Sequence, residues 1–277
     1  MMNKLLIEDI IKNGLKEDIN YFDATTDLLI DEKAQSNAYL VSKETGILAG
    51  VEVFKQVFEI LGGDVEFTQN FNDGDSLEQG DVILELFGNT RTILKGERLA
   101  LNLLQRMSGI ATLAREFADK VKGLDTRIVD TRKTTPNLRI LEKYAVGVGG
   151  CFNHRYNLSD TMMIKDNHIQ AVGSIKKAVE LGKENIPHTM KIEVEVKNIE
   201  ELNEALEAKA DIIMLDNMSV EEMRKSVEIA KGRAVIEASG GVALDTVREI
   251  ASTGVDVVSV GALTHSYKAL DISLLIK

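Results

Sequence analysis

The chain lacks several features that would assign it to common classes of protein. Among its 277 residues there is one cysteine, Cys151, so no disulfide can form within the chain. No apolar run approaches the ~20 residues that a membrane helix needs. The first residues, MMNKLLIEDIIKNGLKED, are too acidic for a signal peptide. A single thiol is typical of a reducing compartment, and we therefore expect a cytoplasmic protein with no membrane partner.

Positive charge is also scarce, because 33 Lys and Arg stand against 44 Asp and Glu and the net charge is −11. Residues 98–168 run against this trend, with 12 basic and 7 acidic residues. A nucleic-acid surface would bias a whole domain towards positive charge, so we expect no nucleic-acid partner. A basic stretch in an acidic protein instead favours a pocket for a small, multiply charged anion.

Three ligand motifs that the chain superficially suggests are incomplete. The segment DGDSLEQGD lacks the closing Glu of an EF-hand and is expected to be a turn. In VGVGG and the residues after it, Phe152 stands where a dinucleotide loop needs its third glycine. His154 and His168 lie 14 residues apart with no third ligand at a suitable spacing, so we expect no zinc site. Cys151 is surrounded by no nucleophile motif and is expected to be a small buried residue.

The pattern of apolar and polar residues differs between the first and second parts of the chain. Up to about residue 105, an N-terminal helix precedes short alternating segments (AYLVSKE, GILAGV, DVEFTQNF, DVILELFG) that Gly and Asp punctuate, which predicts antiparallel strands. Residues 97–121 predict a long helix. From Arg127 onward, apolar strands alternate with amphipathic helices, which predicts a parallel sheet wrapped by helices.

Polar groups end these predicted strands at nearly even spacing. Glu195, Asp216, Ser239 and Gly261 follow one another after 21, 23 and 22 residues, about the length of one strand, one helix and two short loops. Each strand ends in a different polar group, which favours a barrel with its site on the carboxyl-end rim. The number of repeats is too small for a full barrel, and the tail HSYKALDISLLIK has strand character without a following helix.

We therefore predict an α/β protein of two domains. The first is an N-terminal α/β sandwich domain, residues 1–105, joined by the C-terminal tail, residues 266–277. The second is an incomplete, TIM-like α/β barrel, residues 106–265, that carries the active site.

The rim of the predicted barrel changes in chemical character along the chain. It begins with cationic groups, continues with carboxylates and ends with glycines: Arg132, Lys133, His154, Arg155, Lys165, Glu195, Asp216, Ser239, Gly240, Gly241 and Gly261. Arginines hold carboxylates and phosphates, carboxylates bind Mg²⁺ or sugar hydroxyls, and glycine turns expose backbone N–H groups to phosphate. Taken singly, Arg132 would be a surface charge and Glu195 would face solvent on an edge strand. Their order around one rim favours an active site.

Long stretches of the chain resemble quinolinate phosphoribosyltransferases, nearly from end to end. The resemblance rests on LKEDINYFDATTD, GILAG, GERLALNLLQRMSGIAT, DTRKTTPNLRILEKYAV, GGCFNHRYNLSDTMMIKDNH, IEVEV, IMLDN, EASGG and VSVGALTHSYKALDISL. It implies a type II phosphoribosyltransferase that transfers the phosphoribosyl group of phosphoribosyl pyrophosphate (PRPP) to quinolinate with decarboxylation. The products would be nicotinate mononucleotide, pyrophosphate and CO2, in de novo NAD biosynthesis. It also implies a homodimer, or a higher oligomer, whose active sites are shared between subunits.

The resemblance further assigns roles to residues. It implies that quinolinate is surrounded by Thr131, Arg132, Lys133, His154, Arg155 and Lys165, and that Arg98 reaches in from the partner subunit. Glu195 and Asp216 would hold the ribose hydroxyls and Mg²⁺, directly or through water. The 5′-phosphate would be received by Ser239, Gly240, Gly241, Gly261 and Ala262.

Other functions compete with this interpretation. Nicotinate phosphoribosyltransferase and a molybdenum-linked paralogue share the barrel, and the full cationic set argues against both. A barrel aldolase would form a Schiff base on Lys165 or Lys133, which borohydride trapping would detect. A third alternative is a metabolite-binding regulator without turnover, although a carboxylate sensor would not need the acidic and glycine-rich parts.

Overall fold

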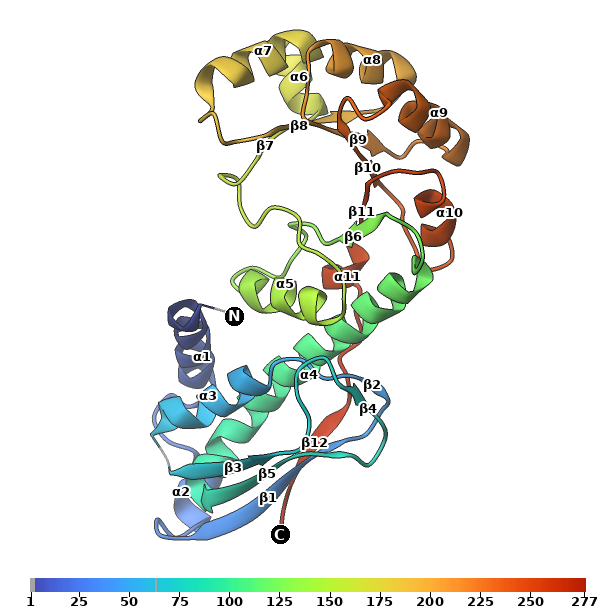
Figure 1. Cartoon of the computed structure of the whole chain (residues 1–277). Coiled ribbons are helices and arrows are strands. Elements are labelled where there is room, and N and C mark those ends of the chain that lie inside the picture. The colour runs from blue at the N-terminus through green and yellow to red at the C-terminus, as the bar shows by residue number, and fades with distance from the viewer. Residues whose placement is uncertain (1–2, 63) are drawn as a thin grey trace. The chain divides into compact units, whose positions relative to one another are not determined.

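The computed structural model describes residues 3–62 and 64–277, and these form two compact units (Figure 1). The first unit draws on residues 1–115, 134–150 and 266–277, and the second contains residues 116–133 and 151–265. The expected domain boundary was residue 105, so residues 106–115 and 134–150 belong to a different unit from the one expected. Met1, Met2 and Gly63 of the GGD turn lie outside the described residues.

The first unit is built on an antiparallel sheet with strand order β12-β1-β5-β3. Its strands are β1 (Gln35–Ser42), β3 (Val65–Gln69), β5 (Val82–Asn89) and β12 (Ile272–Ile276). Ala38 pairs with Leu86 on one side of β1 and with Ile276 on the other. The tail therefore enters the first unit as a strand, because β12 runs antiparallel along the exposed edge of β1. A separate small ladder joins β2 (Gly46–Ile47) to β4 (Ser76–Leu77).

Helices cover this sheet on one side (Figure 1). The covering helices are α3 (Val51–Leu61) and α4 (Thr90–Lys120), of which α4 enters the second unit from Glu116, and the first unit also contains α1 (Lys4–Asp18), α2 (Ala24–Leu29) and α5 (Arg139–Val148). The core is formed where alternate residues of the strands meet the apolar stripe of the helices, with Leu40, Leu84, Phe54, Phe58 and Ile93 fully buried. The sheet with its helical cover is the expected α/β sandwich.

The helix α4 begins seven residues before the predicted start at residue 97. Asn89 ends β5, and its Oδ1 accepts a hydrogen bond from the Thr92 main-chain nitrogen at 3.1 Å. Asn is a preferred N-cap because its side chain satisfies a backbone N–H that has no helical partner. The strand therefore passes directly into the helix, and Asn89 is the signal in the sequence that marks this start.

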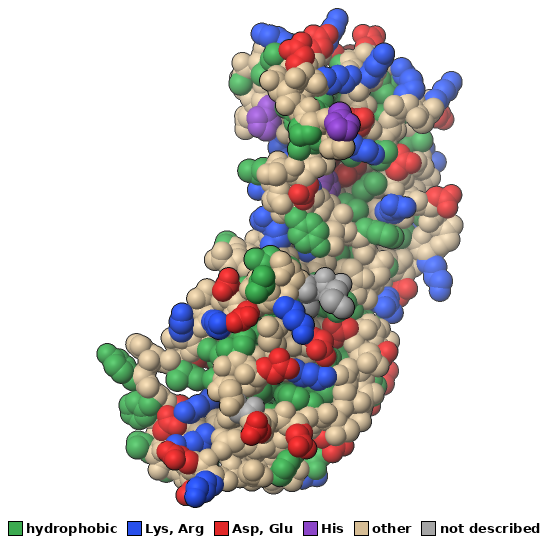
Figure 2. All heavy atoms as spheres, turned by 60° about the vertical axis from the view of Figure 1, so that its left-hand side comes forward, with side chains coloured by type: hydrophobic (Ala, Val, Ile, Leu, Met, Phe, Trp, Pro, Cys, Tyr) green, Lys and Arg blue, Asp and Glu red, His purple; other side chains and the backbone are tan. Residues whose placement is uncertain are grey.

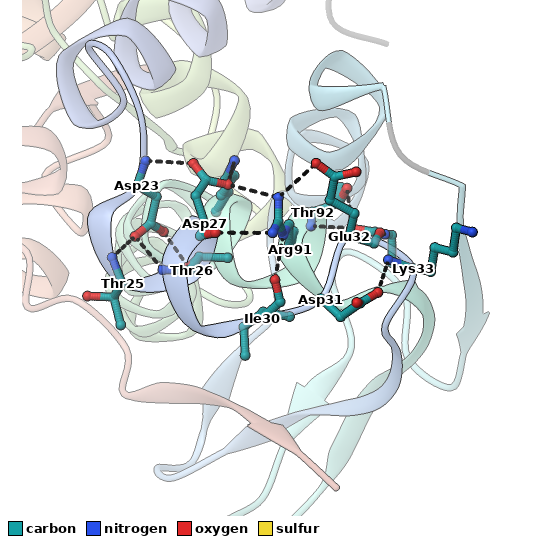
Figure 3. Close-up of polar contacts among 12 residues, drawn as sticks. Asp23, Thr25, Thr26, Asp27, Ile30, Asp31, Glu32, Lys33, Arg91 and Thr92 are labelled. Atoms are coloured by element: carbon teal, nitrogen blue, oxygen red, sulfur yellow. Dashed lines mark hydrogen bonds and ion pairs between the residues drawn. The ribbon is translucent and has the colours of Figure 1, made fainter.

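Polar contacts fasten α2 to α4 (Figure 3). Arg91 donates to the carbonyl oxygens of Ile30 at 2.8 Å and Asp27 at 3.1 Å, and the Lys95 Nζ lies 2.6 Å from Asp27 Oδ1. Asp23 caps the start of α2 by accepting from the main-chain nitrogens of Thr25 and Thr26. The acidic residues of the FDATTD segment are thus used to hold a short helix in place.

The second unit is a parallel sheet of six strands in the order β6-β11-β10-β9-β8-β7. The strands are β6 (Arg127–Val129), β7 (Met162–Ile164), β8 (Ile192–Val196), β9 (Ile212–Asp216), β10 (Val235–Ser239) and β11 (Val257–Ser259). Within the described residues β6 and β7 are not paired with each other, and Phe152 forms an isolated parallel bridge with Val129. The sheet is the expected incomplete barrel.

Helices follow the strands of the second unit and wrap its sheet (Figure 1). They are α6 (Asp166–Val172), α7 (Ile175–Asn185), α8 (Ile199–Glu207), α9 (Val220–Ala230), α10 (Val247–Ala251) and α11 (Ala262–His265). Side-chain caps start several of them, such as Ser219, which accepts from the Glu222 nitrogen. Among the described helices of both units, none is at once long enough and apolar enough to cross a bilayer.

Candidate active site

The carboxyl ends of the parallel strands surround a cavity of about 620 Å³ in the second unit. Parallel strands bring these ends to one edge, which is why side chains from distant positions in the chain converge there. The cavity is lined by Thr131, Arg132, Lys133, His154, Arg155, Met163, Lys165, Glu195, Met214, Asp216, Asn217, Ser239, Gly240, Gly241 and Ser259. Every cationic and acidic residue predicted for the rim is among them.

Three of the predicted residues do not line this cavity. Arg98 is an exposed residue of α4 in the first unit. Gly261 and Ala262 follow β11, just beyond the lining residue Ser259. A Cβ atom on Gly261 would lie 3.2 Å from Cδ of Lys133 and 2.9 Å from Nε2 of His265. The absence of a side chain at Gly261 therefore lets Lys133 lie close to the backbone there.

Buried Asp130 joins the two loops that carry the first cationic residues. Its Oδ1 accepts a hydrogen bond from the His154 main-chain nitrogen, and its Oδ2 accepts from Nδ2 of Asn153, both at 2.8 Å. The loop from Thr131 to Lys133 is further held by Thr264, whose Oγ1 donates to the Lys133 carbonyl at 2.9 Å. Asp130 was not predicted as a site residue, since in the sequence it is only the polar end of a short strand.

Arg155 lies in crowded positive surroundings. Its Nη1 donates to the Thr161 carbonyl at 2.8 Å, and its Nη2 approaches Sδ of Met163 at 3.5 Å. Burial and the neighbouring charge of Arg132 lower the pKa of Arg155. Two like charges held close together in a partly buried pocket favour the binding of an anion, because an anion relieves their repulsion.

Lys165 and Glu195 form an ion pair across the rim. Nζ of Lys165 donates to Oε2 of Glu195, and the Glu195 side chain is mostly buried. Lys165 stands at the end of β7 and Glu195 in the paired strand β8, so the parallel register brings them together. The interpretation of Glu195 as a solvent-facing residue of an edge strand is wrong, because β8 lies between β7 and β9.

His154 faces two carboxylates in the interior of the sheet. Its Nε2 lies 3.4 Å from Oε1 of Glu193 and 3.5 Å from Oε2 of Glu237, and both glutamates are buried. Burial raises the pKa of Glu193. Burial alone would lower the pKa of His154, but hydrogen bonding to Glu193 and Glu237 and their charges raise it to about 10.

One contact of His154 opposes this effect. Nδ1 accepts from the Arg155 main-chain nitrogen at 2.7 Å, which favours a ring without a proton at Nδ1. The attraction of two carboxylates in a buried setting outweighs this single backbone dipole, and the net effect on the pKa of His154 is the rise given above. His168 takes no part in this cluster, because its Nδ1 accepts from the Lys165 main-chain nitrogen at 2.9 Å.

The acidic and glycine-rich parts of the rim adjoin each other. Ser239 pairs with Asp216 in the register of β9 and β10. Gly240 and Gly241 have φ values of 99° and 61°, the left-handed region that glycine adopts without strain. Prediction missed four lining residues, which are Met163, Met214, Asn217 and Ser259. Asn217 had a detectable signal, since it follows Asp216 directly at the end of a buried strand.

Comparison with known proteins relates this geometry to one family. The profile described as quinolinate phosphoribosyl transferase, C-terminal domain, matches residues 110–275, and the profile of the N-terminal domain matches residues 23–108. A probable nicotinate-nucleotide pyrophosphorylase (carboxylating) from Bacillus subtilis is 43% identical over 273 residues, which cover 99% of this chain and 94% of that protein. A quinolinate phosphoribosyltransferase (decarboxylating) from Nicotiana tabacum, named as mitochondrial, is 40% identical over 97% of this chain and 81% of that protein.

Solved structures agree with the sequence comparison. The crystal structure of NadC from Streptococcus pyogenes superimposes with a TM-score of 0.96 at 43% identity, and covers 100% of this chain and 98% of that chain. A human nicotinic acid phosphoribosyltransferase superimposes with a TM-score of 0.62 at 11% identity, over 100% of this chain and 74% of that chain. The second similarity is one of fold alone.

Proposed function

Because the chain belongs to the quinolinate phosphoribosyltransferase family, we propose that the rim cavity of its second unit is where the family's reaction takes place. In that reaction quinolinate takes the phosphoribosyl group of PRPP and loses CO2, giving nicotinate mononucleotide and pyrophosphate for NAD biosynthesis. One observation carries the assignment of the site: cationic, acidic and glycine-rich groups line a single cavity in that order.

The cationic side of the cavity suits the two carboxylates of quinolinate. Arg132, Lys133, His154, Arg155 and Lys165 line it together, with Thr131 beside them. A dianion in a partly dry pocket needs comparable opposing charge, and the mutual repulsion of Arg132 and Arg155 is relieved when that charge arrives. We assign these side chains to binding and orienting quinolinate, with its ring nitrogen towards the sugar of PRPP.

The acidic and glycine-rich side suits PRPP. We assign Glu195 and Asp216 to the ribose hydroxyls and the Ser239–Gly241 turn to the 5′-phosphate, because backbone N–H groups of glycine-rich turns suit phosphate. Gly261 and Ala262 are weaker candidates for that role, since they lie next to the lining residues but outside them.

The donor set also fits Mg²⁺, which prefers oxygen ligands and is usually held by one or two carboxylates together with substrate phosphates. Two carboxylates from adjacent strands, Glu195 and Asp216, face the cavity. Bound there, directly or through water, Mg²⁺ would supply neutralisation of the negative charge on pyrophosphate as it departs.

The chemistry requires no nucleophile from the protein. The ring nitrogen of quinolinate forms the bond to C1 of the ribose as the C1–pyrophosphate bond breaks, and fixed cations stabilise the leaving group. The ring nitrogen is then cationic and accepts the electron pair left when the 2-carboxylate departs as CO2, after which a proton takes its place. Nζ of Lys165 is paired with the Glu195 carboxylate, and the proposed reaction has no step that needs a Schiff base.

A homodimer with shared sites completes the proposal. Large apolar side chains of the first unit are exposed around α1 and α2, namely Leu5, Leu6, Tyr21, Phe22, Leu28 and Leu29, and Figure 2 shows hydrophobic side chains projecting from this unit. Contiguous exposed apolar surface is typical of a protein interface. Arg98 is exposed in the same unit, which supports the proposal that it enters the partner's cavity.

The one buried thiol, Cys151, supports a cytoplasmic location.

Incubation of the purified chain with quinolinate, PRPP and Mg²⁺ tests the function, with nicotinate mononucleotide and CO2 as the products to be measured. Nicotinate in place of quinolinate is the matched control, because it lacks the 2-carboxylate. We expect turnover when PRPP is supplied with quinolinate and no turnover when it is supplied with nicotinate. Excess chelator should abolish the turnover with quinolinate. Equal rates with nicotinate would overturn the assignment of the cationic side, and full turnover in chelator would overturn the role given to Glu195 and Asp216.

A further inference from the structure

Asn217 has an unusual backbone conformation within the cavity lining. Its φ is 54°, in the left-handed region that residues other than glycine seldom adopt. Among the described residues, three others share this property, Asn137, Lys209 and Lys231, and none of them lines the cavity. Strained backbone persists where surrounding contacts hold it, and it is concentrated at functional sites.

The contacts that hold Asn217 connect two strands and two parts of the rim. Its main-chain nitrogen donates to the Ser239 carbonyl at 2.9 Å, which ties the end of β9 to the end of β10. Its Nδ2 donates to Oδ1 of Asp216, also at 2.9 Å. In this left-handed conformation the amide of Asn217 is held against the Asp216 carboxylate.

The same amide group packs against the glycine turn. A Cβ atom on Gly240 would lie 2.2 Å from Oδ1 and 2.4 Å from Cγ of Asn217, far inside van der Waals contact. Gly240 must therefore be glycine for two reasons, its φ of 99° and the proximity of Asn217. One side chain thus contacts both the carboxylate of Asp216 and the backbone of the Ser239–Gly241 turn.

We propose that Asn217 is a positioning residue that fixes the Asp216 carboxylate and the Ser239–Gly241 turn relative to each other, so that PRPP is bound at its ribose and at its 5′-phosphate in one orientation. The inference rests on the function and the binding roles proposed above. A ligand held at two points loses less freedom on binding when those points are already fixed. Misplacement of a bound substrate by about 1 Å can cost about 100-fold in rate.

The test is Asn217→Gly, which removes the amide and keeps the backbone conformation, because glycine adopts positive φ without strain. We expect the KM for PRPP to rise about tenfold or more and kcat to fall, while the KM for quinolinate changes far less. Asn217→Asp retains the shape of the side chain but replaces the Nδ2 donor with an oxygen beside Asp216, and we expect the same direction of change. Lys209→Gly is the matched control, since Lys209 also has a positive φ (59°) but is exposed and does not line the cavity.

Three outcomes are distinguishable. Selective loss of PRPP affinity in Asn217→Gly and Asn217→Asp, with Lys209→Gly unchanged and circular dichroism as in the wild type, supports the proposal. Kinetics within about twofold of wild type in both variants, or equal increases in the KM of both substrates, would overturn it. A wild-type chain without activity on quinolinate and PRPP would instead overturn the proposed function, and this inference with it.

Discussion

The cations of α4 in the first unit and the two arginines of the rim cavity in the second unit have different neighbours. In the first unit, carboxylates lie next to the cations that they balance, as Asp27 does with Arg91 and Lys95, and as buried Glu142 does with Arg106. In the second unit, Arg155 is held by a carbonyl and a thioether and lies close to Arg132, whose charge lowers the pKa of Arg155. Charge balanced within the chain serves the fold, whereas two arginines that repel each other at the rim favour the binding of an anion.

The largest effect is expected from a substitution in the cationic part of the rim cavity. Arg132→Ala should lower kcat/KM for quinolinate by about 100-fold or more, because loss of one partner of a buried charge contact costs several kcal/mol. The urea midpoint of unfolding should stay close to that of the wild type, since the change relieves repulsion from Arg155. Steady-state kinetics and urea denaturation of the same preparation measure the fall in kcat/KM and the midpoint of unfolding. Unchanged kinetics would show that Arg132 is wrongly assigned to the binding of quinolinate.

A mixing experiment tests the proposal that each active site is shared between two subunits. Arg98→Ala removes a residue of the first unit and Lys165→Ala one of the second, and each variant alone should be nearly inactive. In a random mixture, the mixed dimers contain one intact site each, so about a quarter of wild-type activity should return. Activity is measured after co-refolding, with differently tagged chains isolated to verify mixed dimers. No rescue in verified mixed dimers would exclude a site that combines Arg98 with Lys165.

Removal of a cation that is paired with a carboxylate in the first unit should lower the stability of the fold more than it affects catalysis. Arg106→Met leaves the buried carboxylate of Glu142 without its cation and should destabilise the fold by about 3 kcal/mol. Thermal and urea unfolding measure this loss, and the double variant Arg106→Met with Glu142→Gln should recover part of it. The KM for quinolinate should change far less than in Arg132→Ala. A variant as stable as the wild type would contradict the structural role of this pair.

The smallest effect concerns pH and the cluster of His154, Glu193 and Glu237. The pKa of His154 is raised to about 10 in the folded chain, above the value of about 6.5 for an unfolded histidine. The contribution of protonated His154 to the free energy of unfolding is therefore complete below about pH 6.5 and is lost as the pH rises towards 10. Roughly 1–2 kcal/mol of this contribution is lost by pH 8. Urea unfolding at pH 6.5 and pH 8 measures the difference. In the double variant Glu193→Gln, Glu237→Gln this slope should disappear, and an unchanged slope would contradict the assignment.

Much of the fold followed from local pattern. The predicted strands of the second unit form, the chain belongs to the predicted family, and the predicted α/β sandwich with an incomplete barrel is confirmed. These predictions succeeded because buried parallel strands are apolar runs that end in a polar residue, and parallel pairing aligns those ends. The roles assigned to the individual site residues, the Mg²⁺ site and the dimer stay predictions.

What could not be predicted depends on contacts between distant segments. Glu193 and Glu195 alternate in one short strand and point to the same face, yet one is buried against His154 and the other reaches the rim. The depth of each residue is set by the neighbouring strands and not by the strand itself. The grouping of residues 134–150 with the first unit was missed for the same reason, because Glu142 is placed by its contact with Arg106 in another helix.

The amino-acid sequence by itself determined the order of strands and helices and the excess of positive charge between residues 98 and 168, since periodicity and composition are local properties. The tertiary structure alone decided which charges are paired and which face the cavity, because pairing depends on distances between residues far apart in the chain. It also decided the strained turn at Asn217, which exists only where β9 and β10 end side by side.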